Sequence, residues 1–289
     1  MDERACVSKY KKHHKENNSV MDQLRVFIIT QEEPFYIPKV IRYLTQHQNQ
    51  SYKIVGASVL KPHRKNKSMK DWLLERTKIY TWNELFIVLI LMLKCKFLFS
   101  SNHSVSSAMV AEKITQVTTT DVNSFEFTNR LKKLNIDILL AISPPQLFKD
   151  KLINIPIKYC LNAHGTLLPR HRGVFGSWWT IFSGDKEAGA TIHTIDENID
   201  RGEILWQKEF KVHSKDTQYS IAFKTKKLIA IGTVELLNEI AKKKETIVEV
   251  VYTESYHKAP TKEQGQEFHS KGLKIITSGN ANEVVNKEF

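Results

Sequence analysis

Short apolar segments alternate with amphipathic stretches along this chain. The segment IDILLAIS (136–143) is apolar almost without interruption, which is typical of a strand covered on both faces. The predicted strands are 24–30, 53–60, 114–119, 136–143, 158–164, 188–195 and 203–212. The predicted helices are 37–47, 124–134, 176–182 and 217–243, with a further helical stretch that ends near residue 99. The alternation predicts an α/β fold with a mainly parallel sheet and helices on both faces.

The most apolar part of the chain is LFIVLILMLKCKFLF, residues 85–99. Its uninterrupted apolar run ends at Lys94, which makes it too short to span a bilayer. We therefore predict a buried helix and no transmembrane segment. Contact of this helix with a membrane surface or with a partner chain stays open.

The composition is that of a globular protein, with a strong basic excess. The chain has 289 residues, of which 41% are hydrophobic and 26% charged, and its formal net charge is +12. Residues 61–70 (KPHRKNKSMK) include five Lys or Arg residues and no acid. A positive field favours an anionic partner, but it does not distinguish nucleic acid, a phosphorylated small molecule and an acidic membrane surface.

Cysteine usage and the N-terminal residues both indicate the cytoplasm. Cys6, Cys95 and Cys160 lie far apart and form no C-x-x-C pair, so neither a disulfide framework nor a zinc knuckle is indicated. The first residues are polar and charged and lack the apolar core of a signal peptide. We predict that residues 1–22 form a disordered extension.

Candidate chemistry is concentrated at the end of the strand 158–164. In CLNAHGTLLPRHRG, Asn162 and His164 alternate along the strand, so both side chains point to the same side. Ligands of parallel sheets bind beyond the carboxyl ends of strands. Asp200 follows an acidic loop further along the chain.

An Asn, a His and an Asp brought together could stabilise a developing oxyanion and move protons. This set fits direct attack of an amine or water on a carbonyl. From the residue types alone, the alternative is that Asn162 and His164 cap a loop and that Asp200 caps a turn. TQEEPFY follows the first strand in place of G-x-G-x-x-G, and there is no P-loop motif, so nucleotide-binding signatures give no support to dehydrogenase or NTPase chemistry.

The stretch LNAHGTLLPRHRGVFGSWWTIFSGDKEAGATIHTIDENIDRGEIL resembles the folate-dependent formyltransferase family. The matching features are N-x-H, LLP, RG, a Trp in the next helix, G-D, the strand T-I-H and I-D-x-G-x-I, all in the same order. The resemblance implies a Rossmann-like formyltransferase fold and an enzyme that uses 10-formyltetrahydrofolate. It also implies that Asn162, His164 and Asp200 are catalytic.

The same resemblance assigns further residues. The folate is expected between the loop Pro145, Gln146 and Leu147 and the loop that holds Glu197 and Asn198. Arg170, Arg172 and Gly173 are expected on the substrate side. Two positions depart from the family pattern, Gly176 in place of a common proline and Arg201 in place of a small residue. His171, His193 and His213 show no metal-ligand spacing, and we expect no metal.

The tail of the chain bears on the acceptor. We expect a catalytic domain over residues 23–245 and a short tail, 246–289, packing on it. The tail resembles that of formyltransferases of surface-sugar biosynthesis, which act on a primary amine of a nucleotide-linked amino sugar. We therefore expect folate and a small anionic amine as the ligands, and a homodimer stays open.

Methionyl-tRNA formyltransferase, with tRNA as the partner, is the alternative that the basic charge supports. Phosphoribosylglycinamide formyltransferase, formyltetrahydrofolate hydrolase and a non-catalytic binding protein fit less well. The glycine-rich phosphate loop of phosphoribosylglycinamide formyltransferases does not match this sequence. The hydrolases carry an N-terminal regulatory domain that the polar first residues do not resemble. An intact Asn–His–Asp set argues against a non-catalytic binding protein.

Overall fold

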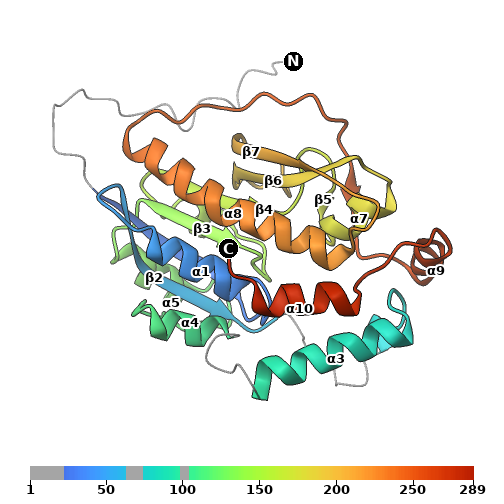
Figure 1. Cartoon of the computed structure of the whole chain (residues 1–289). Helices are drawn as coiled ribbons and strands as arrows, with labels where there is room; N and C mark the ends of the chain where they lie inside the picture. The colour runs from blue at the N-terminus through green and yellow to red at the C-terminus, as the bar shows by residue number, and fades with distance from the viewer. Residues whose placement is uncertain (1–22, 63–73, 98–103) are drawn as a thin grey trace.

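The computed structural model describes residues 23–62, 74–97 and 104–289 (Figure 1). A six-stranded sheet has the order β2-β1-β3-β4-β6-β7. The strands are β1 (Leu24–Gln31), β2 (Tyr52–Leu60), β3 (Ile138–Ile142), β4 (Tyr159–His164), β6 (Glu187–Thr194) and β7 (Ile204–Lys211). Strands β2, β1, β3 and β4 are parallel, whereas β6 and β7 continue the sheet in antiparallel pairing. The predicted α/β fold with a mainly parallel sheet is confirmed.

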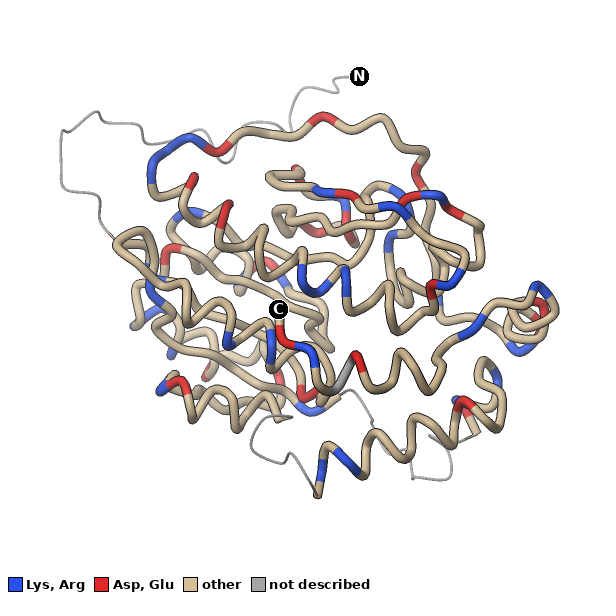
Figure 2. Tube along the Cα trace, in the orientation of Figure 1, with Lys and Arg blue, Asp and Glu red and all other residues tan. Residues whose placement is uncertain are grey.

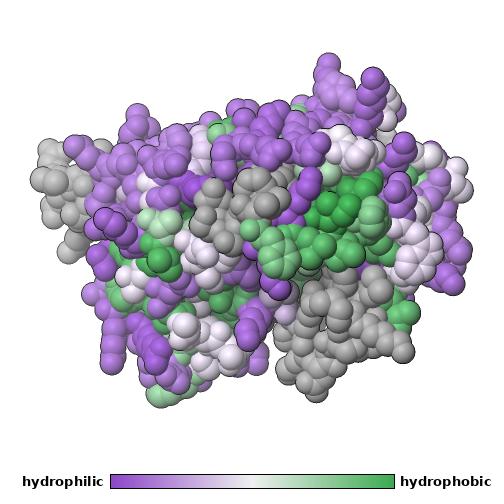
Figure 3. Space-filling view, turned by 60° about the horizontal axis from the view of Figure 1, so that its bottom comes forward, coloured by the Kyte–Doolittle hydropathy of each residue, from purple (hydrophilic) through white to green (hydrophobic). Residues whose placement is uncertain are grey.

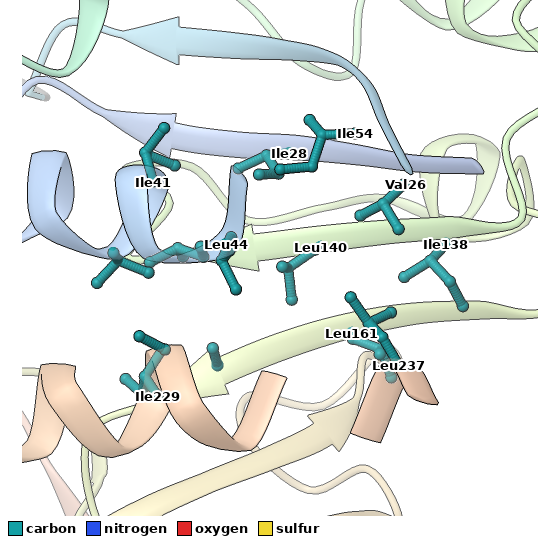
Figure 4. Close-up of a cluster of buried hydrophobic side chains, with 14 of the residues drawn as sticks. Val26, Ile28, Ile41, Leu44, Ile54, Ile138, Leu140, Leu161, Ile229 and Leu237 are labelled. Atoms are coloured by element: carbon teal, nitrogen blue, oxygen red, sulfur yellow. The ribbon is translucent and has the colours of Figure 1, made fainter. Parts of the chain in front are cut away.

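Helices cover both faces of this sheet (Figure 1). Their bounds are α1 (Ile37–Gln46), α3 (Trp82–Phe97), α4 (Val105–Ala111), α5 (Phe125–Lys132), α6 (Asp150–Ile153), α7 (Gly176–Phe182), α8 (Gln218–Ala241), α9 (Lys262–Ser270) and α10 (Ser278–Asn286). On one face, α1 and α8 pack on the parallel strands. Figure 4 shows this core, with Ile41, Leu44, Ile229 and Leu237 of the helices against Val26, Ile28, Ile138, Leu140 and Leu161 of the sheet.

The opposite face is closed by α5 and α6. Phe127 and Leu131 of α5 pack with Phe27, Leu139 and other buried side chains. Alternate residues of one strand therefore enter different cores, as the period of two requires. All five residues of β3 are buried because both its faces are covered, which explains why its sequence is continuously apolar.

The strand predicted at 114–119 is wrong. This segment makes an isolated bridge in which Ala57 of β2 pairs with Gln116. The Ala57 N–H donates to the Thr115 carbonyl (2.9 Å), and the Val117 N–H donates to the Ala57 carbonyl (2.8 Å). The Ile114 N–H donates instead to the Met109 carbonyl (2.8 Å), so the ladder does not extend. The apolar and β-branched residues of this segment mark an edge contact and not a strand.

The prediction of a buried helix over residues 85–99 is wrong for one of its faces. Helix α3 buries Leu85, Val88, Leu91 and Cys95, but Trp82, Phe86, Leu89, Leu93 and Phe97 on its other side are exposed. Figure 3 shows hydrophobic side chains gathered on the side of the molecule that α3 occupies. Residues 98–99 lie outside the described residues. Within the described ranges, no helix is long and apolar enough to cross a membrane.

Residues 246–289 are built into the fold. The short strand β8 (Tyr256–His257) pairs in parallel with β5 (Arg172–Gly173). Phe268 of α9, together with Ile275 and Ile276, is fully buried in a core that includes α7 and the start of α8. The Tyr219 N–H of α8 donates to the Ile275 carbonyl (3.0 Å). The tail therefore completes a core.

Basic and acidic positions are interspersed along the described chain (Figure 2). Two sequence-based expectations concern other charged segments. The basic stretch 61–70 falls mainly on residues 63–70, and the disordered extension was predicted for residues 1–22. Both lie outside the described residues.

Candidate active site

Strand β4 places two polar side chains at the carboxyl edge of the sheet. Asn162 pairs with Ala141 of β3 on one side and with His193 of β6 on the other. His164, two residues on, ends the strand opposite Thr191. Because Asn162 and His164 are two positions apart, they lie on the same face, as their spacing predicted.

Asp200 lies at the centre of this group. Its Oδ1 accepts a hydrogen bond from Asn162 Nδ2 (3.3 Å) and lies 3.6 Å from His164 Nδ1. Its Oδ2 accepts a hydrogen bond from the Gly173 N–H (2.8 Å). Asp200 has a backbone φ of 52°, in the left-handed region that Asp and Asn tolerate better than most residues. The turn thus directs the carboxylate back to the strand, and the three side chains selected from the sequence lie together.

His193 is a fourth member of the group, which the sequence reasoning missed. Its Nε2 lies 3.1 Å from Asn162 Nδ2 and 3.7 Å from Asp200 Oδ1, and its Nδ1 lies 2.7 Å from the Thr194 carbonyl. Since a carbonyl can only accept, Nδ1 carries the proton, and Nε2 accepts from the Asn162 amide. The neutral imidazole therefore fixes the orientation of the Asn162 side chain.

The signal for His193 was non-local. The residue stands between Ile192 and Thr194 in β6, and only the antiparallel pairing of β4 with β6 brings it opposite Asn162. The pKa of His193 is lowered from its ordinary 6.5 to about 4, mainly by burial and also by the nearby His164, while Asp200 opposes the change.

Acid sensitivity should follow from His193. In the unfolded chain its imidazole takes up a proton near pH 6.5, but in the folded chain it does so only near pH 4. Between these values the unfolded state binds more protons, so folding stability falls as the pH falls. We expect the melting temperature to drop over this range in the wild type, and to drop less in His193→Gln.

Thermal unfolding at pH 7, 5.5 and 4.5 would measure this effect. His213→Gln, at an exposed position, is the matched control and should keep the wild-type pH dependence. An identical acid slope in His193→Gln and the wild type would contradict the account of His193.

Gly173 holds Asp200 through its backbone. It has a φ of 98°, and a Cβ at this position would lie 2.3 Å from the carbonyl oxygen of His257 in β8. A side chain is therefore excluded by both backbone conformation and space. The sequence reasoning placed Gly173 on the substrate side, and the structure adds this contact with Asp200, for which an isolated glycine in a turn gives no signal.

The two arginines assigned to the substrate side point toward the tail. The Arg170 guanidinium lies 4.6 Å from the ring centre of Tyr252, and its Nε is 3.6 Å from Asp185 Oδ2. Arg172 donates from Nε to the Ile199 carbonyl (3.0 Å) and from its terminal nitrogen to Glu254. Both side chains thus link the turn after β4 to residues 252–256.

The two loops expected at the folate differ in their contacts. Gln146 is held by the backbone of a neighbouring segment, since its Oε1 accepts from the Val122 N–H (3.0 Å) and its Nε2 donates to the Thr120 carbonyl (2.8 Å). Pro145 adjoins it, and Leu147 is exposed. In the other loop Glu197 and Asn198 are exposed, and the Asn198 N–H donates to Asp196 Oδ1 (2.7 Å). The side chain of Gln146 is thus engaged within the protein, which leaves backbone groups and Leu147 as its loop's contact surface.

Two cavities adjoin these loops. One of about 240 Å³ is lined by Arg172, Asn198, Ile199, Arg201 and Tyr256. The other, of about 440 Å³, is lined by residues 118–121 together with Ser124, Glu126, Phe127 and Arg130 at the start of α5. The first is lined by Ile199 and Arg201, the residues on either side of Asp200, so it borders the turn that holds this carboxylate.

A lysine of α8 lies at the neighbouring edge of the sheet. Lys226 of α8 donates from Nζ to Ser143 Oγ (2.7 Å), directly after β3, and Glu33 lies nearby after β1. Burial lowers the pKa of Lys226 to about 8, and Glu33 opposes this change. Ile142, the residue before Ser143, pairs with Ala163, the residue before His164. The sequence reasoning missed Lys226, because nothing in a long helix marks which lysine turns inward.

In the part of the chain that the structure describes, no group of three or more His, Cys, Asp or Glu side chains is arranged to hold a metal ion. The polar atoms of the site are amide, imidazole and carboxylate groups. The arrangement can donate hydrogen bonds to a developing negative charge and move a proton at His164.

Comparisons with known proteins address this region directly. Residues 96–237 match the family model described as "Formyl transferase". Among curated proteins, the chain is 38% identical over 112 residues to a methionyl-tRNA formyltransferase of Blochmanniella floridana, which covers 39% of this chain and 34% of that protein. The chain therefore matches only about a third of the length of this curated relative.

Solved structures share the fold. A sugar N-formyltransferase from a Shewanella species has a TM-score of 0.54 and 18% identity, covering 81% of this chain and 76% of its own. An N-formyltransferase from Helicobacter canadensis, in complex with folinic acid and dTDP-3-aminofucose, has a TM-score of 0.54 and 16% identity, covering 89% of this chain and 82% of its own. The fold expected from the sequence motifs, and the resemblance to formyltransferases, are confirmed.

Proposed function

We propose that this chain transfers a formyl group from 10-formyltetrahydrofolate to a primary amine. The premise is that it resembles the formyl transferases over the segment that carries its candidate site. The observation that carries the proposal is the convergence of Asn162, His164 and His193 on the Asp200 carboxylate. Asn162 and His164 come from one strand end, whereas His193 and Asp200 come from β6 and the loop after it. If Asn162 only capped a loop, its amide would not need to be oriented by the neutral, buried imidazole of His193.

Each side chain has a distinct task in this proposal. Asn162 is oriented by His193, and its other N–H, which donates to Asp200 Oδ1 in this structure, would turn to donate to the oxygen that gains negative charge. His164 stabilises the same charge and moves protons. Asp200 orients the group and accepts a proton from the attacking amine. Its position is fixed by the Gly173 N–H.

The loops around the site suit a folate. The donor supplies an activated formyl group when it is bound. Backbone groups of residues 145–147 and of residues 197–200 would hold its ring system, with the exposed Leu147 as an apolar contact. The loop 145–147 is anchored by Gln146, so it presents a preformed edge.

We further propose that the acceptor is an amino sugar linked to a nucleotide. Two observations support this acceptor. The similar Helicobacter canadensis structure holds folinic acid and dTDP-3-aminofucose, and the tail of the present chain packs, through Phe268, Ile275 and Ile276, into a core with α7 and the start of α8. A second candidate is methionyl-tRNA, which the 38% identity to a methionyl-tRNA formyltransferase favours.

Incubation of the protein with 10-formyltetrahydrofolate and a panel of amines tests both proposals. The panel contains nucleotide-linked amino sugars, their dephosphorylated counterparts and methionyl-tRNA, and mass spectrometry detects the gain of one formyl group. We expect formylation of a nucleotide-linked amino sugar. Formylation of methionyl-tRNA alone would overturn the acceptor, and no formyl transfer to any amine would overturn the enzyme assignment.

Filter binding provides an independent test of the tRNA candidate. A chain that grips tRNA should bind it with an affinity that falls steeply as salt rises, because each phosphate contact releases counterions. Binding that is weak at every salt concentration would argue against this candidate.

A further inference from the structure

The tail places one carboxylate between two arginines at the edge of the candidate site. Glu254 accepts a hydrogen bond from Arg172 and another from Arg201 Nη2 (2.6 Å). Arg172 directly precedes Gly173, and Arg201 directly follows Asp200. Both arginines are therefore attached to the backbone that holds the catalytic carboxylate.

The arginines differ in how much they need an anion. The side chain of Arg172 is only 9% exposed, and its Nε already donates to the Ile199 carbonyl. Its terminal N–H groups require an acceptor, because a buried guanidinium without one is costly. Arg201 and Glu254 are 54% and 49% exposed, and ion pairs at such positions contribute little. Arg172 thus needs an anion beside it, but the exposed Glu254 carboxylate that fills this role is only weakly held.

The surroundings have the chemistry of an anion site. The cavity of about 240 Å³ is lined by both arginines, by Asn198 and Ile199, and by Tyr256. The Tyr256 ring centre lies 5.7 Å from the Arg172 guanidinium carbon, so an apolar ring borders the charged groups. Guanidinium groups match the paired oxygens of phosphate, and two of them side by side suit a diphosphate.

We propose that Arg172 and Arg201 bind the phosphate groups of the acceptor, and that Glu254 occupies this anion site until the acceptor displaces it. The inference rests on the proposed function, because it assumes that the acceptor carries phosphates. A sugar ring separates the amine of such an acceptor from its phosphates, and the site lies beside the Asp200 turn, where the amine reacts.

Isothermal titration of the full chain with inorganic pyrophosphate tests the proposal without turnover. Glu254→Gln keeps the size of the side chain but removes the competing charge. We expect it to lower the Kd for pyrophosphate by about fivefold, the scale of a half-exposed ion pair. Glu249→Gln, at an exposed acidic position in the same tail, removes the same charge away from the arginines and should leave the Kd at the wild-type value.

Arg201→Gln is the complementary variant. Since Arg201 is half exposed, the change should leave the fold intact and weaken pyrophosphate binding, even if Glu254→Gln fails to fold. An unchanged Kd in Arg201→Gln, or equal Kd values in Glu254→Gln and Glu249→Gln, would overturn the proposal and leave Glu254 as a tether of the tail.

Titration with p-aminobenzoylglutamate distinguishes the source of the anion. This probe carries the carboxylates of the folate end. If Glu254→Gln tightens its binding and not that of pyrophosphate, the site belongs to the folate and the acceptor assignment is overturned. Because binding is measured directly, a protein that binds pyrophosphate as expected but formylates no amine would overturn the proposed function alone.

Discussion

Replacement of His164 by Ala, or of Asp200 by Asn, should lower kcat for formyl transfer by about 10²-fold or more, the usual contribution of a general acid–base group. His164→Ala removes the group that moves protons beside the reacting centre. Asp200→Asn removes the charge that faces His164 Nδ1 at 3.6 Å. Single-turnover formyl transfer to the acceptor identified in the amine panel measures the effect.

The fold should survive both changes. His164 ends a strand and is only partly buried, so its loss leaves the sheet intact. Asn at position 200 fits the left-handed φ of 52° and still offers an oxygen to the Gly173 N–H. His213→Gln is the control for loss of an exposed histidine and should keep wild-type kcat. Near-normal kcat in both His164→Ala and Asp200→Asn would refute the catalytic assignment.

The strands of the sheet could be predicted because local pattern and burial agree there. Residues 136–143 are apolar throughout, and β3 within them is buried on both faces. The long helix predicted at 217–243 begins at Gln218, where Thr217 and Ser220 form a reciprocal cap. Local sequence determines such elements, so one chain is enough to find them.

The predictions that failed depend on what lies across from a segment. Residues 114–119 have strand-forming side chains, but at the edge of β2 only Ala57 pairs with them. Helix α3 is apolar on both sides, and only the folded structure shows that Leu91 is buried while Leu89 is exposed. Hydrophobicity alone does not say which face of a helix has a neighbour.

The candidate site divides in the same way. Asn162 and His164 are two residues apart on one strand, so their spacing is a local signal. His193 lies on β6, a later strand, and reaches Asn162 because β6 pairs with β4. Lys226 reaches this edge of the sheet because of the position of α8. The support that the Gly173 N–H gives to Asp200 involves no side chain at all. Sequence reasoning therefore found the groups proposed to react but missed those that hold them in place.

Gly173→Ala should reveal that support. The new Cβ would meet the carbonyl oxygen of His257 at 2.3 Å, and the φ of 98° is unfavourable for alanine. We expect a loss of about 2 kcal/mol or more in the free energy of unfolding, since backbone strain and a steric clash combine. Because β5 must shift away from β8, the Gly173 N–H also moves from Asp200, and kcat should fall.

Gly184→Ala separates these two causes. Gly184 has a comparable φ of 71°, but a Cβ there meets nothing within 4 Å. This variant should show only the backbone cost, about 1 kcal/mol, with unchanged kcat. Urea unfolding and formyl transfer of both variants, measured side by side, make the comparison. If Gly173→Ala loses no more stability than Gly184→Ala and keeps full kcat, the pairing of β5 with β8 does not position Asp200, and the carboxylate must be held by its own loop.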